Sequence, residues 1–183
     1  STVLFTILAF ISFGQEPSEE TYFEIEFDAF SPPTQDLIMS MEGKPAMPFM
    51  ANDVDGTEQF LNNYRGDVVF LYFMKGDCAD CLAQIGSLNY LQDQNEDLKV
   101  IAFTDEKRKK ATTLAKQNGI EFTLLPNGKL LGEAAYGIEL GYPRLFAIDE
   151  EGVVVHIIPS ELLQGKSDVY LTLNELYHKM RSK

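Results

Sequence analysis

The run VVFLYFM at residues 68–74 constrains the fold of this chain more than any other stretch. It is continuously apolar, β-branched or aromatic, and it shows no alternation with polar residues. A short run of this kind is typical of a central strand that is buried on both faces, as in a sheet covered by helices on each side. With 183 residues, the chain is long enough for one domain with such a core.

Strand and helix patterns alternate after this run. Leu82, Ile85, Leu88 and Leu91 fall at three-residue spacing, which is typical of one face of a helix. Further strands are predicted at 98–104, 120–125, 144–149 and 153–158, helices at 106–119 and 129–137, and a last helix near the C-terminus. The alternation predicts an α/β fold with a parallel sheet flanked by helices. The last two strands flank a short glycine-containing loop and predict an antiparallel hairpin, which makes the sheet mixed.

The N-terminal region differs in kind from the rest. Residues 1–14 carry no charge, and we interpret them as the remnant of a secretory signal or a membrane anchor, although ~20 apolar residues are needed to span a bilayer. A buried terminal strand or helix is the alternative. Residues 15–42 are predicted to form an extension with a half-buried strand at 22–30, which SPPTQ at 31–35 ends. The main domain then covers 43–183, and its expected location is the periplasm or cell envelope.

The composition limits the function classes. The formal net charge of -13 argues against a nucleic-acid partner, because binding of the phosphate backbone relies on Lys and Arg. It also argues against docking on an anionic membrane surface. A hydrophobic content of 45% and a charged content of 23% are ordinary for a soluble globular domain.

The only cysteines, Cys78 and Cys81, form a Cys-x-x-Cys pair just past the predicted central strand. They open a helix, whose N-terminus stabilises an anion such as a thiolate. Their spacing lets the two sulfurs approach to disulfide distance in the first turn. We therefore predict a redox pair, in which Cys78 is the more exposed nucleophile and Cys81 is the enclosed resolving thiol.

A metal site and a structural clip are the alternatives for this pair. A metal site would want two more ligands, and the chain has no second Cys-x-x-Cys motif. The two histidines are expected on a strand surface (His156) and in the solvated last turn (His178). A clip of such a short loop would add little stability. We therefore expect no metal, and no cofactor beyond the redox-active disulfide.

Three segments carry a family resemblance. GKPAMPFMANDVDG (43–56), RGDVVFLYFMKGDCADC (65–81) and YGIELGYPRLFAIDEEGVVVHI (136–157) resemble the thioredoxin superfamily. Within it, the chain looks like the TlpA-like exported thiol-disulfide oxidoreductases, relatives of the alkyl-hydroperoxide-reductase/thiol-specific-antioxidant group. The resemblance implies a thioredoxin-like fold, reduction of disulfides in protein substrates, and an upstream electron donor.

The resemblance also assigns roles at the start of the strand at 144–149. Pro143 falls on the family's cis-proline, which packs against the cysteine pair, and the backbone of the preceding residue, here Tyr142, pairs with the substrate chain. From the residues alone, an ordinary trans proline is the alternative.

The motif departs from the family pattern at several positions. Asp77 stands in place of the usual Trp, Asp80 in place of Pro, and Gln84 in place of a Glu that helps proton transfer. Tyr72 stands where ordinary thioredoxins have a buried acid. These changes leave the sulfurs and the proline in place but put standard proton handling in doubt.

Opposing charges are expected to tune the nucleophile. The helix N-terminus lowers the pKa of the Cys78 thiol, while Asp77 and Asp80 oppose this by like-charge repulsion. Lys75 and Arg144 would offset the carboxylates if they face the sulfurs; otherwise Arg144 is an ordinary surface strand residue. We expect a mildly lowered thiol pKa and a disulfide of reducing character.

Three other functions compete with disulfide reduction. The altered motif is compatible with a non-catalytic binding module that keeps an idle disulfide. Peroxide reductases of related type have a Thr three residues before the reactive cysteine, where this chain has Lys75. A metallochaperone would use Cys78, Cys81 and His156, but such proteins typically have three residues between their cysteines.

Overall fold

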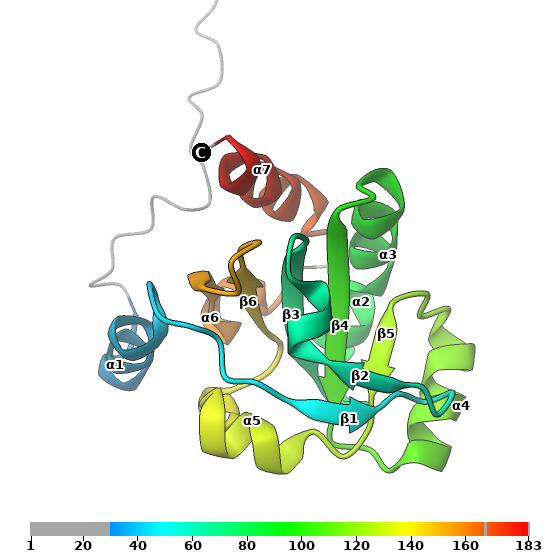
Figure 1. The fold of residues 1–183 in the computed structure, drawn as a ribbon. Coiled ribbons are helices and arrows are strands. Elements are labelled where there is room, and N and C mark those ends of the chain that lie inside the picture. The colour runs from blue at the N-terminus through cyan, green and yellow to red at the C-terminus, as the bar shows by residue number, and fades with distance from the viewer. Residues whose placement is uncertain (1–29, 167, 183) are drawn as a thin grey trace, which may run out of the picture.

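The computed structural model describes residues 30–166 and 168–182 (Figure 1). The predicted signal remnant at 1–14 and all but the last residue of the predicted strand at 22–30 lie outside these ranges. The N-terminal strand extension and the domain boundary at residue 43 therefore remain predictions.

A five-stranded mixed sheet forms the centre of the fold (Figure 1). Its strands, in the order in which they pair, are β5 (Thr123–Leu125), β4 (Leu98–Thr104), β3 (Val68–Met74), β6 (Arg144–Ile148) and β7 (Val154–Ile158). β5, β4 and β3 are parallel, whereas β6 runs antiparallel to both β3 and β7. This arrangement confirms the predicted mixed sheet with an antiparallel hairpin at one edge.

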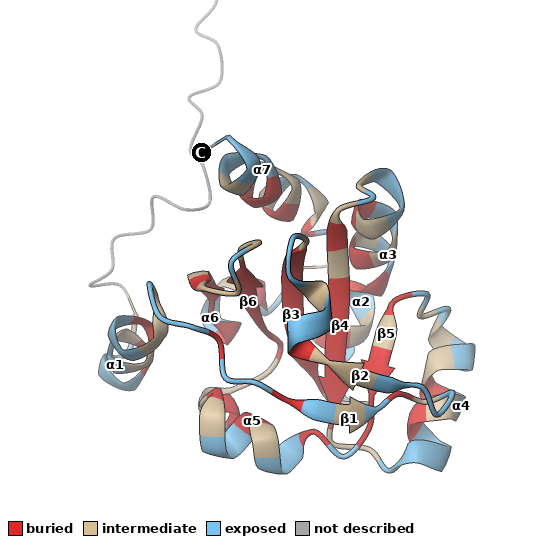
Figure 2. Ribbon diagram, in the orientation of Figure 1, coloured by how far each residue is buried: buried red, intermediate tan, exposed pale blue. Residues whose placement is uncertain are grey.

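Side chains of β3 enter two separate cores. Phe70 and Tyr72 join one cluster and Leu71 and Phe73 join the other, because successive residues of a strand face opposite sides. The first cluster is covered by α2 (Ala79–Ala83), α3 (Ile85–Gln94), α4 (Arg108–Asn118) and α7 (Tyr170–Arg181), and by Leu163 of α6 (Ser160–Leu163). The second is covered by α1 (Pro32–Met41), α5 (Lys129–Ala135) and the 3-10 helix η3 (Ile138–Leu140). Every residue of β3 is buried, as predicted, and Figure 2 shows the buried strands between exposed helix faces. Each large apolar side chain buried in this way stabilises the fold by about 1.5–3 kcal/mol.

Helix α1 corrects the prediction that SPPTQ at 31–35 is only a break. The helix begins at Pro32, and Gln35 N donates to Ser31 O at 3.0 Å. Proline is accepted in a first helical turn because its missing N–H would have no partner there. The helix buries Thr34 and Ile38, and Ile38 extends the second core.

A second, two-stranded sheet lies before the central one. It pairs β1 (Met50–Asn52) with β2 (Glu58–Phe60) and is followed by the 3-10 helix η2 (Leu61–Tyr64). The sequence pattern did not predict β2. Asp53 stabilises the turn between the strands, since its Oδ1 accepts hydrogen bonds from the backbone N–H groups of Asp55 and Thr57.

Helix and strand ends differ from the predictions by a few residues. α4 begins at Arg108, two residues later than predicted, and ends at Asn118. Gly119 follows in the left-handed conformation, where glycine is favoured. β5 has only three residues. None of the helices within the described ranges is long and apolar enough to cross a membrane.

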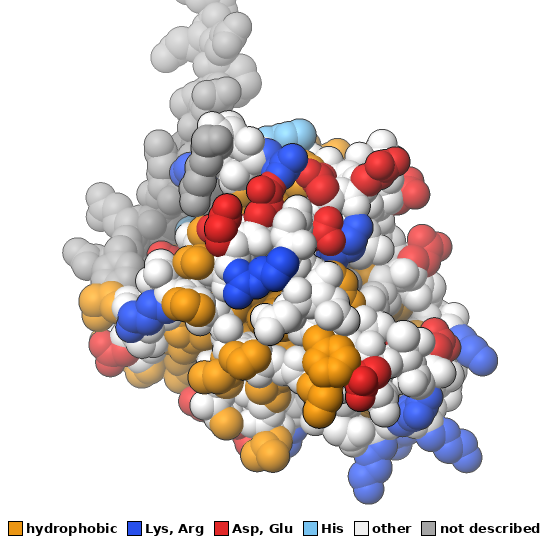
Figure 3. Space-filling model, in the orientation of Figure 1, with side chains coloured by type: hydrophobic (Ala, Val, Ile, Leu, Met, Phe, Trp, Pro, Cys, Tyr) orange, Lys and Arg blue, Asp and Glu red, His pale blue; other side chains and the backbone are white. Residues whose placement is uncertain are grey.

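The surface has an uneven distribution of side chains. On the face drawn in Figure 3, hydrophobic side chains gather over β1 and α5, while most acidic side chains lie in the upper part of the view. Met50 of β1 and Leu130 of α5 are among the exposed large hydrophobic residues.

Candidate active site

The central strand delivers the cysteine pair to a helix. After β3 ends at Met74, Cys78 N donates to Lys75 O at 3.3 Å, which tightens the turn. Cys78 is the N-cap of α2, and its Sγ accepts a hydrogen bond from Cys81 N at 3.1 Å. The two cysteines form a disulfide with an S–S distance of 2.07 Å, so the structure represents the oxidised form.

The two sulfur-bearing residues differ in exposure. Cys81 is 0% exposed and lies in the first core, whereas Cys78 is only partly buried. An external thiol or disulfide can therefore reach Cys78 but not Cys81. This asymmetry is the one that the sequence predicted from the position of the pair at a helix start.

The Tyr142–Pro143 segment lies beside the end of β3. The peptide bond between these residues is cis, the isomer that the family resemblance implies. β6 begins directly afterwards, and its first residue pairs with Phe73. Lys75 links the two segments, since its Nζ lies 4.8 Å from the centroid of the Tyr142 ring. This contact is a cation–π interaction, so Lys75 faces the tyrosine.

Two polar side chains are buried behind the disulfide. The Tyr72 hydroxyl donates to Cys81 O at 3.2 Å and to Gln84 Oε1 at 3.1 Å. Burial raises the pKa of Tyr72 far above its usual value, and the nearby charge of Asp80 adds to the shift. Gln84 is 1% exposed, so its amide hydrogens need partners within the protein.

Gln84 and Asp80 hold a segment from the other end of the chain. Gln84 Nε2 donates to Leu163 O at 2.8 Å and to Lys166 O at 3.3 Å. Asp80 Oδ1 accepts from Gly165 N at 3.0 Å. We call residues 163–166, which run from the last residue of α6 onward, the post-α6 segment. Sequence reasoning missed it, because no local pattern signals a contact between residues 79 positions apart.

Asp77 and Asp80 occupy different environments. Asp77 is exposed on the loop that leads to Cys78, whereas Asp80 is partly buried and bonded to the post-α6 segment. Both carboxylates come from the short stretch that carries the cysteines. The predicted effect of their charges on Cys78 stays a prediction.

Arg144 requires a correction. It was predicted to lie on the surface or to pair with Asp77 or Asp80, but it is 0% exposed. It alternates with Leu145, which belongs to the core that contains Cys81, so its side chain points to the opposite face of the sheet. It therefore lies on the side of the sheet away from α2.

The guanidinium group of Arg144 is only partly paired. Its Nη1 donates to Gly137 O, while Nε and Nη2 have no hydrogen-bond partner among the described residues. Burial lowers the pKa of Arg144, and the charges of Glu161 and Glu139 act in the opposite direction. Arg144 thus supports the loop before Pro143 from behind.

A hollow of about 230 Å³ opens beside Tyr142. It is lined by Lys75, Asp105, Lys129, Glu133, Ile138, Glu139, Gly141 and Tyr142. Burial raises the pKa of Tyr142 to about 12, and the charges of Asp105 and Glu133 contribute, so this phenol is neutral. A substrate chain bound at Tyr142 would lie next to this hollow.

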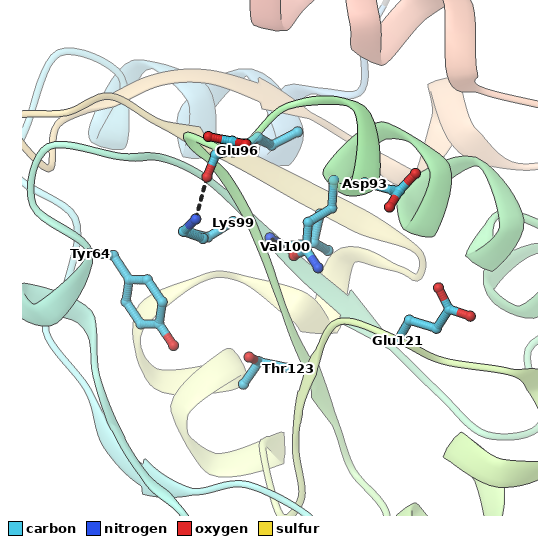
Figure 4. A pocket seen from close by; sticks show the side chains of 9 residues that line it. Tyr64, Asp93, Glu96, Lys99, Val100, Glu121 and Thr123 are labelled. Atoms are coloured by element: carbon cyan, nitrogen blue, oxygen red, sulfur yellow. Dashed lines mark hydrogen bonds between the residues drawn. The ribbon is translucent and has the colours of Figure 1, made fainter.

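A larger hollow lies at the other end of the sheet. It measures about 430 Å³ and is lined in part by Leu98, Lys99 and Val100, which begin β4 (Figure 4). Lys99 is held there by a hydrogen bond to Glu96 O. The cysteines lie at the opposite, C-terminal end of the parallel strands, so this hollow is separate from them.

The histidines do not join the cysteines. His156 is half-buried on β7, with Nδ1 3.4 Å from Glu42 Oε1, and His178 is exposed on α7. Within the described ranges, no group of three or more His, Cys, Asp or Glu side chains is placed to hold a metal ion.

Known proteins share this architecture. The chain is 27% identical over 134 residues to the thiol-disulfide oxidoreductase ResA of Bacillus thuringiensis subsp. konkukian, covering 70% of this chain and 76% of that protein. A crystal structure of a candidate thiol:disulfide interchange protein DsbE from Chlorobium tepidum is 26% identical with a TM-score of 0.59, covering 66% of this chain and 89% of the other.

A more distant structure shows the fold alone. The thioredoxin domain of the thiol-disulfide oxidoreductase BVU-2223 from Bacteroides vulgatus is 18% identical and superimposes with a TM-score of 0.61. The match covers 74% of this chain and 96% of that domain.

Fold, cysteine pair and relatives together define the class of the protein as a thioredoxin-like thiol-disulfide oxidoreductase. Residues 43–157 match the AhpC/TSA family. The chain belongs to that family.

Proposed function

We propose that the protein reduces disulfide bonds in exported protein substrates, with Cys78 as nucleophile and Cys81 as resolving thiol. The observation that carries the proposal is the unequal exposure of the two cysteines at the end of β3. Because only Cys78 is accessible, the first bond to a substrate forms there. Because Cys81 lies within bonding distance of Cys78, the second step is intramolecular.

The reaction is a balanced thiol–disulfide exchange. The Cys78 thiolate attacks one sulfur of the substrate disulfide, forms a mixed disulfide and releases the other substrate sulfur as a thiolate. The Cys81 thiolate then attacks Cys78 Sγ and releases the second substrate sulfur. Two electrons pass to the substrate, and the enzyme is left with the Cys78–Cys81 disulfide seen here. A dithiol donor must return two electrons before the next cycle.

Tyr142 and Pro143 are proposed to guide the substrate. A chain that presents its disulfide to Cys78 would pass Tyr142, because both residues are partly buried against the first core and Lys75, three residues before Cys78, faces the Tyr142 ring. Pro143 itself is buried, so the partly exposed Tyr142 is the residue that the approaching chain meets. The backbone of Tyr142 would then pair with the substrate.

An exported location fits this chemistry. The ResA and DsbE relatives are named as a thiol-disulfide oxidoreductase and a thiol:disulfide interchange protein, and disulfides persist mainly in oxidising compartments. A reductase needs a partner there that supplies electrons, so we propose an upstream thiol donor in the cell envelope. The uncharged segment at residues 1–14 would direct or anchor the chain there.

Reduction of a protein disulfide with dithiothreitol as electron donor tests the proposal. We expect turnover with the wild-type chain and none with Cys78→Ser. With dithiothreitol removed after reduction, Cys81→Ser should accumulate a mixed disulfide with the substrate, whose partner can be identified by mass spectrometry. If the wild-type chain is no faster than dithiothreitol alone, the protein is a binding module; consumption of hydrogen peroxide instead would assign a peroxidase.

A further inference from the structure

The post-α6 segment contacts both the cysteine-bearing helix α2 and the Tyr142–Pro143 segment. Its anchors are the Gln84 and Asp80 contacts described above, which come from α2 and its C-terminal end. A further contact reaches the Tyr142–Pro143 segment, since Gln164 Nε2 donates to Tyr142 O at 3.3 Å. The segment therefore spans from the cysteine helix to the residue before the cis proline.

The Gln164 contact resembles a strand pairing. Tyr142 lies two residues before Arg144, where β6 and its ladder with β3 begin. An N–H group that donates to this carbonyl adds to the sheet as the N–H of an extended peptide would. In the structure, the side-chain amide of Gln164 takes that place.

We propose that Gln164 is a specificity-determining residue, whose amide holds the Tyr142 carbonyl until a substrate chain displaces it. The inference rests on the proposed function, because it requires Tyr142 to receive the substrate backbone. Disulfides with flanking peptide groups must compete with Gln164. A small disulfide without peptide groups does not use the carbonyl and is insensitive to this residue.

Displacement requires little rearrangement. Gln164 is exposed, so its side chain can rotate into solvent. Gln84 is buried and bonds to carbonyls on both sides of Gln164, so the backbone of the segment stays in place. The competing contact is one neutral, solvent-exposed hydrogen bond, which corresponds to about a three- to tenfold effect on affinity.

Two disulfides of different size test the inference. One is a flexible peptide with an internal disulfide, and the other is hydroxyethyl disulfide, which has no peptide group. For Gln164→Ala we expect about a three- to tenfold rise in kcat/KM for the peptide, through a lower KM, and no change for hydroxyethyl disulfide. Gln164→Glu keeps the size of the side chain but cannot donate, and it should give the same rise.

Gln117→Ala is the matched control, because it removes an exposed glutamine on α4. It should leave both substrates unchanged. Equal kcat/KM values for the peptide with wild type and Gln164→Ala would overturn the inference while the proposed function stands. A fall with Gln164→Ala would also overturn it, since Gln164 would then assist binding. Failure of the wild-type chain on both disulfides would overturn inference and proposed function together.

Discussion

Gln84 shows how one side chain can exchange a chemical role for a structural one. The family resemblance implies a glutamate that moves protons at this position, yet the glutamine here uses its amide to hold Leu163 O and Lys166 O. A carboxylate could not donate to either carbonyl. The residue therefore fixes the segment that carries Gln164 beside the substrate path.

We predict that Gln84→Glu lowers the free energy of unfolding by about 1–3 kcal/mol near neutral pH, because the buried Leu163 carbonyl and the partly buried Lys166 carbonyl lose their donor. Burial beside carbonyls will raise the pKa of the new carboxyl group above its unfolded value of about 4.3. The loss is thus largest at neutral pH and shrinks as pH falls through the raised pKa, where the protonated acid can donate. Urea unfolding across this pH range measures both effects.

Gln117→Glu provides the control for Gln84→Glu, since it introduces the same charge at an exposed site on α4. Its stability should stay within about 0.5 kcal/mol of wild type. A Gln84→Glu variant that is as stable as wild type at neutral pH would show that the amide contacts contribute nothing.

At the scale of elements, α7 is held against the start of β4 through Asp97. The Tyr177 hydroxyl donates to Asp97 Oδ1, and Arg181 Nη2 lies 2.9 Å from Asp97 Oδ2. The hydrogen bond from Tyr177 is the main cause that holds the pKa of Asp97 below its usual value of 3.8. Burial opposes it, and the charge of Arg181 adds to the lowering. The contact ties the last helix to the central sheet.

We predict that Asp97→Asn lowers the free energy of unfolding by about 0.5–1 kcal/mol near neutral pH, an amount limited by solvent screening. A carboxyl group whose folded pKa is lowered stabilises the fold above its unfolded pKa. This stabilisation is lost as pH falls through the lowered folded value. The two chains should therefore converge in strongly acidic buffer, as measured by denaturant unfolding at several pH values.

Asp36→Asn, on the exposed side of α1, also removes one carboxylate. It should leave the free energy of unfolding unchanged. If Asp97→Asn and wild type differed by a constant amount down to the acid limit, the stabilisation would not come from the ionised carboxylate.

Sequence patterns predicted the elements that sit deepest in the fold. The strands at 68–74 and 98–104 agree with β3 and β4 at both ends. The first run is apolar throughout and the second is apolar except for Lys99 and Thr104, and burial on two faces leaves little freedom of register. Helix α1 was missed, since two consecutive prolines signal a break as readily as a helix start. β2 was missed because EQF, at residues 58–60, has no apolar alternation.

The candidate site was only partly predictable, because some of its contacts depend on how distant parts of the chain pack together. Local spacing places Cys78 and Cys81 at a helix start, and a strand pattern places Pro143 before β6. The side of the sheet on which Arg144 lies depends on the pairing of β6 with β3, which no local pattern specifies. The contacts of Gln84 likewise require the final packing of α6.

The charge of the whole molecule affects how substrates arrive. A formal net charge of -13 attracts basic proteins over distances of about a Debye length. We predict that kcat/KM for a basic protein disulfide falls several-fold (~3–10-fold) between low and high salt. The uncharged hydroxyethyl disulfide serves as control and should react at a constant rate. Equal salt dependence for the two would exclude long-range attraction as the cause.

The unequal exposure of the cysteines also bears on oxidative damage. A peroxide that diffuses to the reduced site meets Cys78 and converts it to a sulfenic acid. Cys81 lies next to it and can condense with that sulfenic acid, with loss of water, to give the disulfide already observed. Further oxidation to the irreversible sulfinic acid occurs only if it is faster than this intramolecular condensation. We therefore expect the buried cysteine to protect its exposed neighbour from overoxidation.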